Sequence, residues 1–137
     1  MRGGAEPTRP ALALAVALAT LAAPARAQPS SDDAASRGAA IVASRSIGLC
    51  ILCHAVPGVD PVQAGTLAPS LAGVGARLDA DELRQRLVAP RRFNPATIMP
   101  SYAATEGLER VASARRGQPL LDARQIDDVV AYLVTLK

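Results

Sequence analysis

The stretch Cys50-Ile51-Leu52-Cys53-His54 is the most informative part of this 137-residue chain. Two thiols separated by two residues and followed at once by a histidine form the attachment motif of a c-type haem. Each thiol can form a thioether with one of the two vinyl groups of the porphyrin, and the histidine then reaches the iron from the proximal side. The motif therefore predicts one covalent, iron-containing haem c, with Cys50, Cys53 and His54 at its attachment site.

Three other uses of the two cysteines stay open at this point. Cys50 and Cys53 could form a disulfide in an oxidising compartment. They could act as a thioredoxin-like redox pair, although such a pair expects a βαβ context. They could also bind zinc with His54, but no second pair of Cys or His follows elsewhere in the sequence.

The second axial ligand is predicted by elimination. His54 is the single histidine of the chain, so a second histidine from the same chain is excluded. Met99 is the one methionine outside the N-terminal segment discussed below, and the prolines around it indicate a loop that can present its thioether to the iron. His/Met ligation occurs in cytochromes c and raises the reduction potential. The alternative for Met99 is an ordinary core position.

If His54 and Met99 fill both axial positions, the iron has no open site at which oxygen or peroxide could bind. This favours electron transfer over oxygen or peroxide chemistry. The haem propionates also need partners in the protein. Arg77, Arg91 and Arg92 are candidates, and a solvated surface position is an equal alternative for each of them.

The first 27 residues have the features of a secretory signal peptide. Arg2 and Arg9 are basic, residues 11–23 are almost wholly apolar, and Ala25-Arg26-Ala27 supplies small residues for cleavage. An apolar run of about 13 residues is shorter than the roughly 20 that a membrane helix needs. We expect cleavage after Ala27, a periplasmic location, no membrane span after cleavage, and one domain over residues 28–137.

Charge and composition argue against nucleic-acid binding. The formal net charge is +3, and removal of residues 1–27, with three Arg and one Glu, lowers it to +1. The remaining arginines are interleaved with acidic residues, and the only aromatic residues are Phe93, Tyr102 and Tyr132. So small a domain with so few aromatic side chains would be helped by a large flat group to pack around.

The periodicity predicts an all-α fold of three to five helices around the haem. Asp32 or Asp33 is expected to cap a helix that ends near Ser44 and buries Ala40, Ile41 and Val42. A second helix is expected after Asp79, which is its cap, with Glu82 as the capping partner. This helix is expected to bury Leu83, Leu87 and Val88 and to end at Pro90.

Two further helices are expected in the last third of the chain. One is a short helix at 106–116. The other begins at the capping pair Asp122 and Gln125 and reaches the C-terminus, with Ile126, Val129, Val130 and Leu133 along one apolar face. Loops rich in Pro and Gly are expected at 55–71 and 91–101.

Three segments besides the haem motif resemble the class I cytochromes c and, more narrowly, the SoxX family of small monohaem subunits of SoxAX complexes. The resemblance runs from about Ile41 to Lys137, and its segments are residues 69–77, 94–102 and 125–133. The run Asn94-Pro95-Ala96-Thr97-Ile98-Met99-Pro100-Ser101-Tyr102 narrows the family most. Ala68-Pro69 stands where these cytochromes usually have Gly-Pro. In this class the loop that contains the proline lies beside the proximal histidine, and a carbonyl of that loop orients the imidazole. The alanine therefore leaves the geometry of the loop open.

The resemblance implies a role in thiosulfate oxidation. SoxAX complexes join a sulfur substrate such as thiosulfate oxidatively to a cysteine of the carrier SoxYZ, and the catalytic haem belongs to SoxA. By resemblance, this chain would be the electron-transfer subunit of an L-cysteine S-thiosulfotransferase, without a catalytic centre of its own. A SoxA-like c-type cytochrome would be its stable partner, with transient contacts to a SoxYZ-like carrier and a downstream cytochrome c. The alternatives are a free-standing periplasmic cytochrome c shuttle and a thiol–disulfide enzyme that uses Cys50 and Cys53.

Overall fold

A computed structural model describes residues 1, 3, 4 and 30–137 of the chain. This part contains four α-helices, three short 3-10 turns and no strand, so the predicted all-α fold is confirmed. The elements in chain order are α1 (Ser31–Ala43), η1 (Cys50–Leu52), α2 (Val74–Arg77), α3 (Ala80–Val88), η2 (Pro90–Arg92), η3 (Ser113–Arg115) and α4 (Ala123–Leu133). Apart from residues 1, 3 and 4, the predicted signal segment lies outside the described part of the chain, and so does its cleavage site. Both stay predictions.

Capping boxes begin the three longer helices. The Asp79–Glu82 box of α3 and the Asp122–Gln125 box of α4 are as predicted. The cap of α1 differs, because the side chain of Ser30 accepts a hydrogen bond from the backbone N–H of Asp33 at 3.2 Å. The carboxylate of Asp33 in turn accepts a hydrogen bond from the backbone N–H of Ser30, which completes the capping box. Ser30 is therefore the N-cap, and the prediction of Asp32 or Asp33 was wrong.

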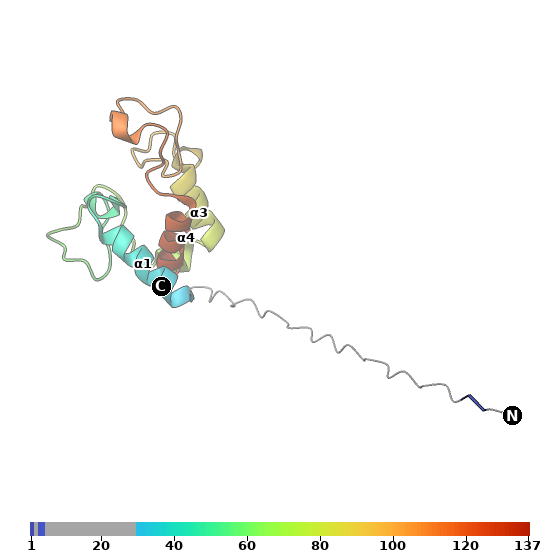
Figure 1. The fold of residues 1–137 in the computed structure, drawn as a ribbon. Coiled ribbons are helices and arrows are strands. Elements are labelled where there is room, and N and C mark those ends of the chain that lie inside the picture. The colour runs from blue at the N-terminus through green and yellow to red at the C-terminus, as the bar shows by residue number, and fades with distance from the viewer. Residues whose placement is uncertain (2, 5–29) are drawn as a thin grey trace.

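Helix α1 crosses α4, and α3 packs against α4 as well (Figure 1). The crossing of α1 and α4 is close because residue 38 is glycine. A Cβ atom added at Gly38 would lie 1.9 Å from the backbone oxygen of Asp128. Beside this point, the guanidinium of Arg37 donates hydrogen bonds to both carboxylate oxygens of the buried Asp128, at 2.7 and 2.6 Å.

Several predictions about helices are wrong in detail. The stretch 106–116 is not a helix beyond η3, because Gly107 has a φ of 68°, which is left-handed. Helix α4 ends at Leu133 and so does not reach the C-terminus. Ala40 and Val88 are exposed because each lies on the outer side of its helix. The short helix α2 was not predicted.

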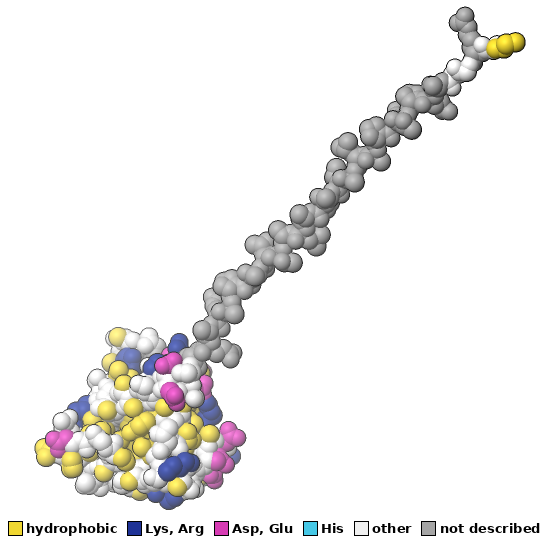
Figure 2. Space-filling model, turned by 90° about the horizontal axis from the view of Figure 1, so that it is seen from below, with side chains coloured by type: hydrophobic (Ala, Val, Ile, Leu, Met, Phe, Trp, Pro, Cys, Tyr) yellow, Lys and Arg dark blue, Asp and Glu magenta, His cyan; other side chains and the backbone are white. Residues whose placement is uncertain are grey.

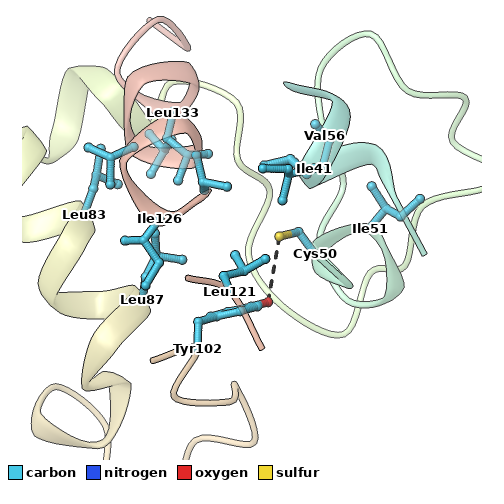
Figure 3. Close-up of a cluster of buried hydrophobic side chains, with 14 residues drawn as sticks. Ile41, Cys50, Ile51, Val56, Leu83, Leu87, Tyr102, Leu121, Ile126 and Leu133 are labelled. Carbon is cyan, nitrogen blue, oxygen red and sulfur yellow. Dashed lines mark hydrogen bonds between the residues drawn. The ribbon is translucent and has the colours of Figure 1, made fainter. Parts of the chain in front are cut away.

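The hydrophobic core lies between α1, α3 and α4 (Figure 3). The four predicted apolar positions of α4 are all buried, as are Ile41 and Val42 of α1. Tyr102 is the one buried aromatic side chain in the described part of the chain, with 3% of its surface exposed. The core is therefore built mainly from Val, Leu and Ile, and it surrounds the cavity described below.

Acidic and basic side chains lie near one another around a largely apolar and neutral centre on the face shown in Figure 2. None of the helices in the described residues is both long enough and apolar enough to cross a bilayer.

Candidate functional site

The Cys50–His54 segment folds into a tight turn. Leu49 enters it with a left-handed backbone, at a φ of 61°. The backbone N–H groups of Cys53 and His54 then both donate to the carbonyl oxygen of Cys50, at 3.1 and 2.9 Å. Two thiols and an imidazole are thereby held within one turn of backbone.

This turn borders a cavity of about 430 Å³. Its walls come from α1, η1, α2, α3, α4 and the two loops that were predicted at 55–71 and 91–101. Most of the lining side chains are apolar, and the full set is Val42, Cys50, His54, Pro69, Ser70, Leu71, Val74, Arg77, Leu78, Leu83, Arg86, Leu87, Met99, Tyr102, Val129 and Leu133. A volume and lining of this kind suit an organic cofactor.

A second cavity of about 400 Å³ adjoins the first and is bordered by Cys53. The two cavities share four lining residues, which are His54, Pro69, Met99 and Tyr102. The predicted site residues therefore meet in one place. Cys50 borders the first cavity, Cys53 the second, and His54 and Met99 border both.

The ring of His54 is oriented by the backbone of the following loop. Its Nδ1 atom lies 2.6 Å from the carbonyl oxygen of Pro69. A carbonyl only accepts hydrogen bonds, so Nδ1 carries a proton, and in the neutral ring the lone pair then belongs to Nε2. A neutral imidazole with a free Nε2 is the form that binds a metal.

The alanine at position 68 does not disturb this contact. Ala68 is not among the residues with positive φ, and its N–H donates to the carbonyl oxygen of Cys53 at 2.9 Å. The geometry left open by the departure from Gly-Pro is therefore settled: an ordinary backbone angle at Ala68 still presents the Pro69 carbonyl to His54.

Met99 is presented by a loop that has its own internal hydrogen bonds. The backbone N–H of Met99 donates to Oγ1 of Thr97 at 3.1 Å. The loop is tied to the end of α3 by the N–H of Tyr102, which donates to the carbonyl oxygen of Leu87 at 3.0 Å. Met99 is half-buried and packs against the edge of the core.

The two cysteines differ in environment and are not joined in a disulfide. Cys50 is buried, and its Sγ atom lies 3.8 Å from the hydroxyl of Tyr102 (Figure 3). That hydroxyl donates to the carbonyl oxygen of Gly48 at 2.8 Å. Burial raises the pKa of the Cys50 thiol and, more strongly, that of Tyr102.

The other uses of the cysteines find no support in this arrangement. A redox-active thiol needs a lowered pKa, and that of Cys50 is raised. The described residues form no strand for a βαβ unit. They also hold no group of three His, Cys, Asp or Glu side chains placed to bind a metal such as zinc.

The arginines are placed differently from the expectation. Arg91 and Arg92 are exposed and border neither cavity. Arg77 borders the first cavity and donates to the carbonyl oxygen of Ala72 at 2.8 Å. Arg86 borders it too. Arg86 was not among the predicted arginines, although its position three residues after Leu83 was a signal, because residues at that spacing share a helix face.

The sequence model of the cytochrome c family matches residues 35–137 of this chain. The chain belongs to the cytochrome c family. A chain in the crystal structure of SoxXA from P. pantotrophus is similar to this cytochrome, with 34% sequence identity and a TM-score of 0.66. That alignment covers 74% of this cytochrome and 80% of the other chain. No curated protein matches. The two matches identify a SoxX-like monohaem cytochrome c.

Membership of the family means that this cytochrome carries covalently bound haem c, as predicted. The residues present fit that group. Cys50, Cys53 and His54 supply the attachment motif, the cavity beside them is lined mainly by apolar side chains, and the tautomer of His54 leaves Nε2 free.

Proposed function

We propose that haem c is joined through thioethers to Cys50 and Cys53, and that its iron is ligated by His54 and Met99. The observation that carries this proposal is that His54, from the cysteine turn, and Met99, from the 91–101 loop, border the same two cavities. The hydrogen bond from His54 to Pro69 supports the proximal role, because it points the lone pair of Nε2 away from the loop.

A bound haem supplies reversible one-electron transfer, which is the role of this cytochrome. Its own residues set how readily that electron is taken up. A thioether at Met99 favours the reduced state, and so does the apolar lining, which keeps water from the oxidised centre. Ligation by both residues would leave no open position for a substrate.

Replacing Met99 tests the ligation. Met99→Ala should keep the covalent haem, because both thioethers remain, but should lower the reduction potential and let external imidazole bind. Val62→Ala is the control, since the Val62 side chain is 92% exposed and borders neither cavity. Absorption spectroscopy and redox titration are the measurements. A Met99→Ala protein with the potential and spectrum of the wild type would exclude Met99 as the ligand.

We infer that this cytochrome is the electron-transfer subunit of a periplasmic SoxAX-type complex. The likeness to a chain of SoxXA supports this assignment. The stable partner would then be a SoxA-like c-type cytochrome, and a SoxYZ-like carrier and a downstream cytochrome c would bind transiently. The complex would couple thiosulfate to a cysteine of the carrier as an L-cysteine S-thiosulfotransferase, and this subunit would pass on the electrons released.

Affinity purification of the tagged protein from its own host, grown on thiosulfate, tests the subunit assignment. The expected result is a stoichiometric second c-type cytochrome, identified by mass and resistant to a high-salt wash. A stable subunit buries a large, apolar interface, whereas a shuttle binds its partners briefly. Recovery of the haem protein alone would contradict the subunit assignment and favour the free-standing shuttle.

A further inference from the structure

Arg86 is a cation that borders the haem cavity and pairs with no carboxylate in the described part of the chain. It lies on α3 between the buried residues Leu83 and Leu87 and borders the same cavity as both. Its Nε atom is the one buried side-chain nitrogen or oxygen in the described part of the chain that has no hydrogen-bond partner. Neither of the ion pairs between described residues includes Arg86.

Phe93 holds the guanidinium of Arg86 in place. The central carbon of the guanidinium lies 4.3 Å from the centroid of the Phe93 ring. Such a cation–π contact orients the group but leaves its N–H donors unused. A buried donor without an acceptor is unfavourable, and more so on a charged group, so the arrangement points to an acceptor that enters with a ligand.

The acceptor that suits this position is a carboxylate. A guanidinium matches a carboxylate in both charge and shape, since two parallel N–H donors meet two oxygens. The family's cofactor brings two such groups into the cavity, because each haem c carries two propionates. The geometry points to Arg86 as the residue that binds a haem propionate, a role that rests on the haem placement proposed above.

The other candidate arginines are less suited to this role. Arg77 borders the cavity, but its side chain is exposed and already donates to the Ala72 carbonyl. Arg91 and Arg92 border neither cavity. Arg86 therefore replaces Arg91 and Arg92 as the candidate partner, and its fixed positive charge also raises the reduction potential, because oxidation adds positive charge to the iron.

The test compares Arg86→Gln, Arg86→Lys and the control Arg92→Gln as holoproteins. Redox titration measures the potential, and resonance Raman spectroscopy measures the propionate bending band. Arg86→Gln should lower the potential and shift the band. Arg86→Lys should restore most of the potential, because the charge remains, but its band should stay shifted, because a point charge cannot form the paired contact. Arg92→Gln should match the wild type in both.

Several results would overturn the assignment. One such result is a propionate bending band in Arg86→Lys at the same position as in the wild type. This comparison can be made even if Arg86→Gln does not fold. Another is an Arg92→Gln protein that changes as much as Arg86→Gln. Failure of the haem placement would be distinct, because the wild type itself would then lack covalent haem or Met99→Ala would keep the wild-type potential and spectrum.

Discussion

The Nδ1 atom of His54 lies 2.6 Å from the carbonyl oxygen of Pro69, which is 15 positions further along the chain. A loop residue thus determines which nitrogen of the only histidine carries the proton. Cys53 joins the same arrangement, because its carbonyl oxygen accepts the N–H of Ala68 at 2.9 Å. The haem-attachment turn and the 55–71 loop therefore support one another.

His54→Ala should prevent maturation of a stable holoprotein, because no other imidazole exists in the chain to bind the iron. We expect little or no covalent haem by haem staining after denaturing electrophoresis, together with loss of the haem absorption. Met99→Ala is the matched comparison and should retain the stain. A normal yield of holoprotein from His54→Ala would contradict the proximal role.

Ala68→Gly should leave the haem spectrum and potential unchanged. The residue does not need a left-handed backbone, and the Pro69 carbonyl already meets His54 with alanine in place. The glycine variant should be less stable by about 0.4–1 kcal/mol, because its unfolded chain has more conformational freedom. Urea unfolding of the holoprotein measures this difference. A more stable glycine variant would show that Ala68 is strained.

Gly38→Ala should destabilise the protein through the contact between α1 and α4. The added Cβ would lie 1.9 Å from the Asp128 oxygen and 2.9 Å from the Cβ of Tyr132, so the helices must move apart. Overpacking of this kind costs about 1–3 kcal/mol. The control is Ser36→Ala, on the exposed side of the same helix. Equal unfolding midpoints for the two variants would disprove the close crossing.

The Arg37–Asp128 ion pair should make stability depend on pH on the acidic side. Hydrogen bonding from Arg37 lowers the pKa of Asp128. The pair therefore stabilises the folded state above the unfolded pKa of about 3.9, and this contribution is lost as pH falls through the lowered folded value.

Asp128→Asn tests this dependence by urea unfolding between pH 7 and pH 3. The variant should be less stable than the wild type at pH 7, and the difference should narrow below about pH 4. Asp127→Asn is the control, because Asp127 pairs with Arg84 on the exposed side of α4, where ion pairs contribute little. A difference for Asp128→Asn that stays constant with pH would refute the role of the pair.

Local sequence signals predicted the elements whose cause is local. The boxes of α3 and α4 were identified because an acidic cap and a partner three residues later satisfy backbone N–H groups within one turn. The cap of α1 was misplaced, because Ser30, Asp32 and Asp33 are all good capping residues and only the observed hydrogen bonds distinguish them. The expected helix at 106–116 failed because Gly107 and Arg110 inside it take left-handed angles.

The sequence by itself determined the covalent chemistry of this protein. The spacing of Cys50, Cys53 and His54 specifies a haem c, and the amphipathic period of 122–133 specifies the last helix, because both depend on neighbours in the chain. Only the tertiary structure decided that Met99 shares a cavity with His54, that Pro69 orients the imidazole, and that Arg86 turns inward while Arg92 stays outside. The physical reason is that these relationships join segments distant in sequence, and they arise only when α1, α3 and α4 pack together.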